Sequence, residues 1–107
     1  MAKTRIMFIE NKTESLNGDA RIGKVTFSQT GRSVHYNRQT FLKVKGYKYN
    51  HVDVESLEQY WISGCKKDGN DRLYGGTKPV HIDEDIREEY WCVIRELPQF
   101  KSEVSHY

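Results

Sequence analysis

Short segments in which apolar and polar residues alternate make up most of this chain before residue 82. The clearest is 22–28, where Val25 and Phe27 fall on one side of an extended chain and Lys24 falls on the other. This two-residue period is typical of a half-buried β-strand. Other segments predicted as strands are 4–10, 33–37, 40–45, 47–54, 59–64 and 78–82, the last a short edge strand beside Pro79.

Small polar residues predict the turns between these strands. Residues 28–32 form a predicted hairpin turn, with Gly31 where a positive φ angle is needed. The next two strands are so close that 37–39 must turn tightly, and Asn37 tolerates the left-handed conformation that such a turn requires.

One amphipathic helix is predicted from Glu84 to Leu97. Asp83 is its expected N-cap, and Pro98 ends it. Its apolar stripe consists of Ile86, Tyr90, Val93, Ile94 and Leu97. Trp91 lies about 100° away from that stripe, and we expect it to be buried against the barrel edge. Residues 99–107 are expected to form a flexible tail.

These elements predict one mainly β (α+β) domain over residues 1–107. We expect a small curved antiparallel sheet or SH3-like barrel of about five to six strands with one C-terminal helix. Apolar residues make up 36% of the chain, so the core must be small. Aromatic residues make up 12% and the net charge is only +2, which argues against intrinsic disorder.

Charge is distributed unevenly along the sequence. Between Arg21 and Tyr49 there are seven Lys or Arg and no Asp or Glu, whereas 83–103 has seven acids and three bases. Within 40–45, Lys43 and Lys45 share one strand face with Phe41, which predicts an apolar face opposite a basic face that bears an aromatic ring. The blander alternative is that the basic and acidic halves neutralise each other within the domain.

A basic β-surface predicts an anionic partner, either RNA, DNA or an acidic protein surface. The function expected is therefore that of a non-enzymatic binding module. Candidate anion-binding residues are Lys24, Arg32, Arg38, Lys43, Lys45, Lys48, Lys66, Lys67 and Arg72.

Aromatic side chains offer a second kind of contact, either as stacking platforms or as protein-binding residues. The candidates are Tyr36, Tyr49, Trp61 and Tyr74. Tyr60 and Trp61 must face opposite sides of their strand, so one is expected in the core and the other nearer the surface. The alternative function is a protein-interaction module that uses the aromatic sheet face or edge, with a homo-oligomer through that edge as one form.

Residues 65–76 form a predicted loop rich in Gly, Lys and Asp. Its spacing matches neither phosphate-binding glycine motifs nor a calcium loop. Two lysines beside Cys65 would lower the pKa of its thiol if the side chain were exposed. A less favoured hypothesis places a small-ligand or hydrolase site here, with Cys65 or His51 beside Asp53, Asp68 or Asp71. We expect no catalytic residues, metal site or cofactor, since no Cys–His pairing or metal-ligand spacing occurs.

Compartment is predicted from what the sequence lacks. No apolar run approaches the roughly 18 residues of a membrane span, and no secretory signal is recognised at the start. Cys65 and Cys92 are then expected to be free thiols in the cytoplasm.

Three stretches together resemble a family of small bacterial proteins for which no activity is established. They are RIGKVTFSQTGRSVHYN, HVDVESLEQYWISGCKKDGNDRLYGG and VHIDEDIREEYW, and they cover most of 21–98. The resemblance implies a signature at 61–64, Lys66-Lys67 and Asp71-Arg72, without assigning those residues a role.

Overall fold

The computed structural model describes residues 3–13, 20–46, 49–69, 71 and 80–106. Within these residues the strands are β1 (Lys3–Asn11), β2 (Ala20–Phe27), β3 (Ser33–Tyr36), β4 (Gln39–Lys43), β5 (His51–Asp53), β6 (Gln59–Gly64), β7 (Val80–Ile82) and β8 (Ser105–His106). The helical turns are η1 (Glu84–Ile86), α1 (Arg87–Glu89), η2 (Tyr90–Ile94) and η3 (Pro98–Phe100).

The first six strands close into an antiparallel barrel. Their order is β1-β6-β5-β4-β3-β2, and pairing of β1 with β2 closes the ring. That pairing is long, running from Lys3 opposite Phe27 to Glu10 opposite Ala20. The predicted small β-barrel with one C-terminal helix is confirmed.

The turn predictions hold in detail. Gly31 has a φ of 75° in the β2–β3 hairpin. Asn37 and Arg38 have φ values of 48° and 67°, and Tyr36 pairs with Gln39 across them. Two successive left-handed residues match the twist of a two-residue hairpin.

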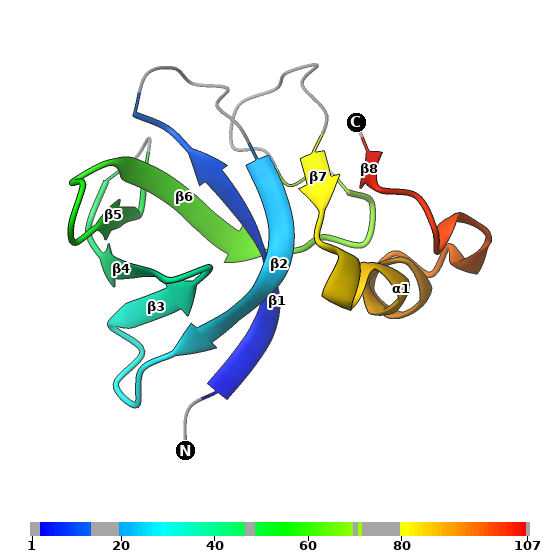
Figure 1. The fold of residues 1–107 in the computed structure, drawn as a ribbon, viewed down its shortest axis with the longest axis horizontal. Helices are drawn as coiled ribbons and strands as arrows, with labels where there is room; N and C mark the ends of the chain where they lie inside the picture. The colour runs from blue at the N-terminus through cyan, green and yellow to red at the C-terminus, as the bar shows by residue number, and fades with distance from the viewer. Residues whose placement is uncertain (1–2, 14–19, 47–48, 70, 72–79, 107) are drawn as a thin grey trace.

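A smaller layer joins the barrel through β2. The first residues of β2 pair in parallel with β7, whereas Thr26 and Phe27 pair with β3. β8 then pairs with β7 on its other side. The prediction of an edge strand at 78–82 is therefore wrong, because β7 has partners on both sides. In Figure 1 the barrel lies on the left, and β7, β8 and the helical turns lie on the right of the β1–β2 crossing.

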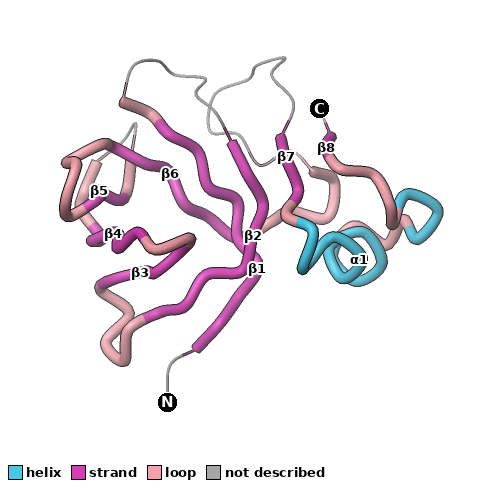
Figure 2. Tube along the Cα trace, in the orientation of Figure 1, coloured by secondary structure: helices cyan, strands magenta, loops and turns pink. Residues whose placement is uncertain are grey.

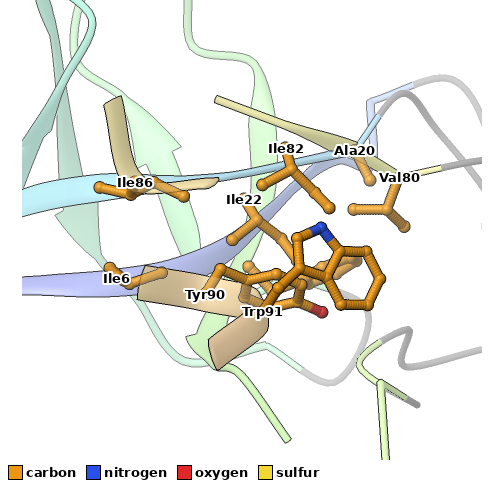
Figure 3. Close-up of a cluster of buried hydrophobic side chains, with 9 residues drawn as sticks. Ile6, Ala20, Ile22, Val80, Ile82, Ile86, Tyr90 and Trp91 are labelled. Atoms are coloured by element: carbon orange, nitrogen blue, oxygen red, sulfur yellow. The ribbon is translucent and has the colours of Figure 1, made fainter. Parts of the chain in front are cut away.

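Two apolar clusters lie on the two sides of β1. Met7 and Ile9 point into the barrel, where they pack with Val25, Val34, Phe41 and Ile62. Ile6 and Phe8 point the other way, into a cluster with Ile22, Ile82, Ile86, Tyr90 and Trp91 (Figure 3). Because β1 is buried on both faces, its sequence alternates only weakly.

The faces of β4 are the reverse of those predicted. Phe41 lies fully buried in the barrel opposite Val34, while Leu42 is 47% exposed on the outside. Lys43 shares the inward side with Phe41 but ends the strand and is exposed. A large ring fills the narrow barrel, and the neighbouring Leu42 then has to face solvent.

The helix is shorter and less regular than predicted. It spans 84–94 as a 3-10 turn, one α-helical turn and a π-turn, gathered on one side of the sheet (Figure 2). Glu96 has a φ of 54°, and the N–H of Leu97 donates to the Trp91 carbonyl at 2.8 Å. The left-handed conformation of Glu96 is typical of a helix end, and the bond from Leu97 to Trp91 closes a turn one residue wider than that of a Schellman end, so the helix stops before Pro98 is reached.

The π-turn changes which side chains face the core. The N–H of Arg95 donates to the Tyr90 carbonyl at 2.9 Å, which closes a turn one residue wider than an α-helical turn. Tyr90 and Trp91 are both buried as a result, whereas Val93 is 67% exposed. Burial of Trp91 is confirmed, and the placement of Val93 in the apolar stripe is wrong.

The segment expected as a flexible tail contains η3 and β8. The Trp91 indole N–H donates to the Glu103 carbonyl at 3.0 Å, and its ring lies 5.6 Å from that of Phe100. These contacts fix the return of the chain to β7. In the described part of the chain, no helix has the length and apolar character needed to cross a membrane.

Candidate functional site

Antiparallel pairing gathers exposed cations at one end of the barrel. Lys3 lies opposite Phe27, the last residue of β2. Across the next hairpin, the N–H of Lys43 donates to the Arg32 carbonyl at 2.8 Å. We call the following residues, which lie at or close to strand ends here, the basic rim: Lys3, Arg5, Arg32, Lys43 and Lys45.

Four strand-end segments that carry the basic rim, 3–5, 27–33, 43–46 and 49–51, contain no Asp or Glu. β6 also ends here beside Arg5, and the loop after it brings Asp71 close to Cys65. At the other end, the β5–β6 connection carries Asp53, Glu55 and Glu58. The basic rim and the β5–β6 connection therefore carry opposite charges at opposite ends of the barrel, although Arg38 also lies at the end with the acids.

His51 lies at the inner side of the basic rim. It is buried, and burial together with the charge of Lys43 lowers its pKa to about 4. Its Nδ1 is 2.8 Å from the Asn50 side-chain oxygen, which also accepts from the N–H of Ile62. Because that oxygen only accepts, Nδ1 carries the proton, and His51 is neutral near pH 7.

The predicted basic residues do not form one set. Arg32, Lys43 and Lys45 belong to the basic rim. Lys24 lies in the middle of β2, and Arg38 lies in the β3–β4 turn at the opposite end. Lys48 and Arg72 lie outside the described residues.

Lys66 and Lys67 follow β6 and lie beside the helical turns. With Arg95 and Leu97 they line a shallow hollow, and Lys67 pairs with Glu96 at 2.7 Å. Both partners of that ion pair are exposed, so it contributes little stability.

Lys3 and Arg5 are not among the predicted residues because they precede the start of the acid-free stretch, Arg21, by 18 and 16 residues. The signal was present in the KTR start of β1, where two cations alternate with a threonine. Arg5 also reaches β6, since a Cβ added to Gly64 would lie 2.7 Å from its Nη2 atom.

The predicted interaction aromatics are mostly engaged inside the fold. Trp61 is half-buried and packs against the cluster beneath the helical turns, while Tyr60 packs on the barrel cluster. The two therefore face opposite sides as expected, but neither is fully exposed. Tyr49 is half-buried, and Tyr74 lies outside the described residues.

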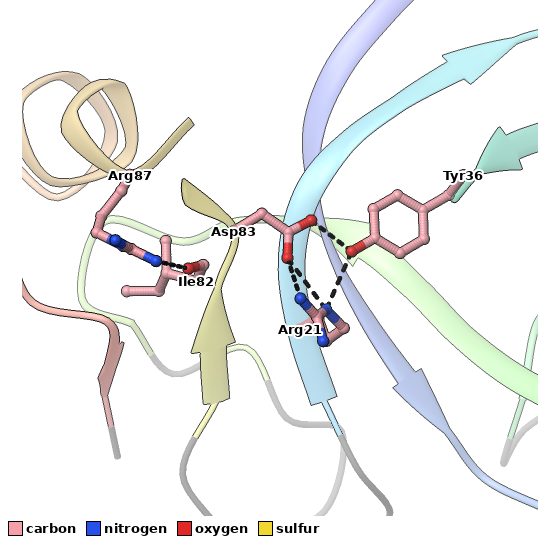
Figure 4. A network of polar contacts seen from close by, with 5 residues as sticks. All are labelled: Arg21, Tyr36, Ile82, Asp83 and Arg87. Atoms are coloured by element: carbon pink, nitrogen blue, oxygen red, sulfur yellow. Dashed lines mark hydrogen bonds and ion pairs between the residues drawn. The ribbon is translucent and has the colours of Figure 1, made fainter. Parts of the chain in front are cut away.

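Tyr36 belongs to a polar network with Arg21 and Asp83. Its hydroxyl donates to Asp83 at 2.5 Å, and Arg21 donates to the same carboxylate at 2.6 Å (Figure 4). Burial and the Asp83 charge raise the pKa of Tyr36 well above its usual value, so the phenol stays protonated. Asp83 therefore does not cap the helix with its side chain as predicted.

This network lines a polar hollow of about 500 Å³ between the ends of β3 and β7. Its floor is β2 at Gly23, where an added Cβ would lie 2.4 Å from an Asp83 carboxylate oxygen. Arg87, nearby, donates to the Ile82 carbonyl at 2.9 Å (Figure 4). The contacts among Arg21, Tyr36 and Asp83 fasten β7 to the barrel at this hollow.

The described part of the 65–76 loop is organised internally. Asp71 is buried and accepts from the N–H of Lys66 at 2.6 Å. Burial and the Asp71 charge raise the pKa of the Cys65 thiol to about 12, so the adjacent lysines do not activate it. Arg95 donates to the Lys67 carbonyl at 2.9 Å and stacks over Trp91, which holds the loop against the helical turns.

Other acidic groups also have structural partners. Asp53 accepts from Gln39 at 2.8 Å and from the N–H of Glu55 at 2.8 Å, so it fixes the β5–β6 turn. Glu10 on β1 and Lys12, just after that strand, form a buried ion pair at 2.8 Å. Among the described residues no group of three metal-ligating side chains occurs.

Comparisons with family models, with curated proteins and with solved structures give no match to this chain. The resemblance to a family of small bacterial proteins therefore stays a prediction.

Proposed function

We propose that this protein is a non-enzymatic binding module whose basic rim contacts the phosphate backbone of RNA or DNA. The observation that carries the proposal is the clustering of cations in the basic rim, where Arg32 and Lys43 are hydrogen-bonded neighbours and Lys3 and Arg5 follow on the adjoining strand.

The placement of the cations, rather than the net charge of the chain, favours binding of a polyanion. Cations at the ends of paired strands are held on a common surface, so a polyanion can contact several of them at once. Each contact with a phosphate releases a condensed counterion, which favours binding at low salt. The acidic β5–β6 connection at the far end would repel the same ligand and orient it towards the rim.

The chemistry of the remaining groups supports a binding role over a catalytic one. A nucleophilic cysteine needs a thiolate and a nearby base. The raised pKa of Cys65 opposes the first requirement, and its sulfur lies 3.9 Å from the Ile6 carbonyl. Cys65 and Cys92 are both free thiols, in keeping with the reducing cytoplasm that we propose as the location.

A salt titration tests the proposal. Filter binding of labelled RNA and DNA should give affinities that fall steeply with salt. The expected log–log slope is about −0.7 per phosphate contacted for single strands and about −0.9 for duplex DNA. Absence of retention at low salt would contradict the proposal.

A second candidate function is protein binding at the outer face of β4 and β5. Leu42 and Val54 are 47% and 49% exposed there, and Leu57 in the following turn is 71% exposed. This patch replaces Trp61 as the surface for that alternative. Recovery of one stoichiometric protein partner, insensitive to nuclease and lost on Leu57→Ser, would favour it over nucleic-acid binding.

A further inference from the structure

The basic rim contains a hollow of about 470 Å³, whose lining includes an aromatic ring as well as cations. It is lined by Lys3, Arg5, Phe27 and the turn residues 28–31. Lys3 faces Phe27 directly across the β1–β2 pair, and Arg5 is the next residue on that side of β1. One aromatic ring thus lies beside two flexible cations and a polar turn.

Phe27 lies at the edge of the apolar cluster inside the barrel. Its neighbours Val25 and Val34 are fully buried, while Phe27 is only half-buried at the edge of the same cluster. The base of this ring is fixed by the core, and part of it faces the hollow. A ring held in this way can receive a flat ligand without losing conformational entropy of its own.

The turn adds uncharged donors to the hollow. Within it, Gly31 donates to the Ser28 carbonyl at 3.0 Å and Ser28 donates to the Ser33 carbonyl at 3.0 Å. The N–H groups of Gln29 and Thr30 make no hydrogen bond to another described residue. Nothing lies within 4 Å of a Cβ built on Gly31, so an anion can approach this backbone closely.

We propose that this hollow binds one nucleotide of a single-stranded nucleic acid. The base stacks on Phe27, and the adjoining phosphate contacts Lys3, Arg5 and the turn N–H groups. This inference rests on the proposed function and specifies its ligand. Bases within a duplex are covered by stacking on both faces, whereas an unpaired base can turn its face to a protein ring.

The test compares single-stranded RNA of about 12 nucleotides with its duplex form, by fluorescence anisotropy on the full chain. Wild type should bind the single strand more tightly than the duplex. Phe27→Leu keeps an apolar side chain but removes the ring, and it should weaken single-strand binding on the order of 10-fold with an unchanged salt slope. Phe100→Leu makes the same change at an exposed ring far from the rim and should have no effect.

The cations are tested separately from the ring. Lys3→Ala/Arg5→Ala should make the salt slope shallower by about 1.4, or 0.7 for each lost contact. Circular dichroism melting checks that each variant is folded. A free mononucleotide should compete only weakly, because it offers one base and lacks the neighbouring phosphates.

Three outcomes would overturn the inference. They are wild-type affinity in Phe27→Leu, equal affinity for duplex and single strand, and competition by the mononucleotide as strong as by the oligonucleotide. Each would leave salt-dependent binding at the basic rim standing. By contrast, failure of wild type to bind either form at low salt would remove the proposed function as well.

Discussion

Tyr36 on β3 donates a hydrogen bond of 2.5 Å to Asp83, the residue that follows β7. These residues are 47 positions apart in the sequence. Arg21 donates to the same carboxylate, so three segments meet at one partly buried polar contact. The contact links the barrel with the layer formed by β7 and the helical turns.

Gly23 controls this junction. Gly23→Ala would put a Cβ 2.4 Å from Asp83 and 2.5 Å from the Tyr36 ring, so it should destabilise the fold by about 2–3 kcal/mol. Gly31→Ala is the matched control, since its surroundings are open and only its positive φ opposes the change. It should cost about 1 kcal/mol. Urea unfolding measures both, and equal losses would contradict the steric account.

The residue types in the turns predicted those turns correctly. The basic rim as a whole was not predicted from the sequence, because its residues are brought together by strand pairing over long sequence distances. Asn37 and Gly31 both adopt a positive φ angle, which these residue types tolerate regardless of their tertiary surroundings. By contrast, Lys3 joins Arg32 at one rim only because β1 pairs with β2. The same strand pairing places Lys24 and Arg38, which belong to the same acid-free stretch as Arg32, outside that rim.

His51 should make stability depend on pH between about 6.5 and 4. Its folded pKa is lowered to about 4, so the unfolded chain binds the proton first as pH falls, and stability drops across that window. The loss should be on the order of 1–2 kcal/mol beyond that of a His51→Gln variant. Urea midpoints at several pH values measure it. His35→Gln, at an exposed site, should keep the wild-type profile.

Sequence periodicity did not predict which face of β4 or of the helical turns would be buried. Phe41 and Leu42 are both apolar, and alternation cannot say which enters the barrel. Trp91 lies in the core because a π-turn replaces regular α-helix, and no residue type predicts such a turn from the sequence.

The thiol of Cys65 should react slowly with thiol reagents. With its pKa raised to about 12, less thiolate is present at pH 8 than for an ordinary cysteine. Cys92→Ser leaves Cys65 as the one thiol of the chain. Its labelling by a thiol reagent should be at least about 100-fold slower than that of a free cysteine peptide. Labelling at the free-peptide rate in the folded protein would contradict its burial.

Leu57 combines a φ of 64° with 71% exposure, which is unfavourable for both backbone and side chain. Leu57→Gly should therefore stabilise the protein by about 0.5–1 kcal/mol, because glycine adopts this conformation without strain. Leu57→Ala keeps the backbone strain and should give little gain. Thermal unfolding compares the two, and destabilisation by Leu57→Gly would show that the side chain supports the fold.

The most direct test of the basic rim compares two triple variants that remove the same charge. Lys3→Ala/Arg32→Ala/Lys43→Ala neutralises the rim, and Lys24→Ala/Arg38→Ala/Lys66→Ala neutralises three exposed cations elsewhere. For single-stranded RNA, the rim variant should lose affinity on the order of 100-fold, with a salt slope shallower by about 2. The second variant should stay within about threefold of wild type. Equal loss in both would mean that the whole molecule's charge, and not the rim, attracts the ligand.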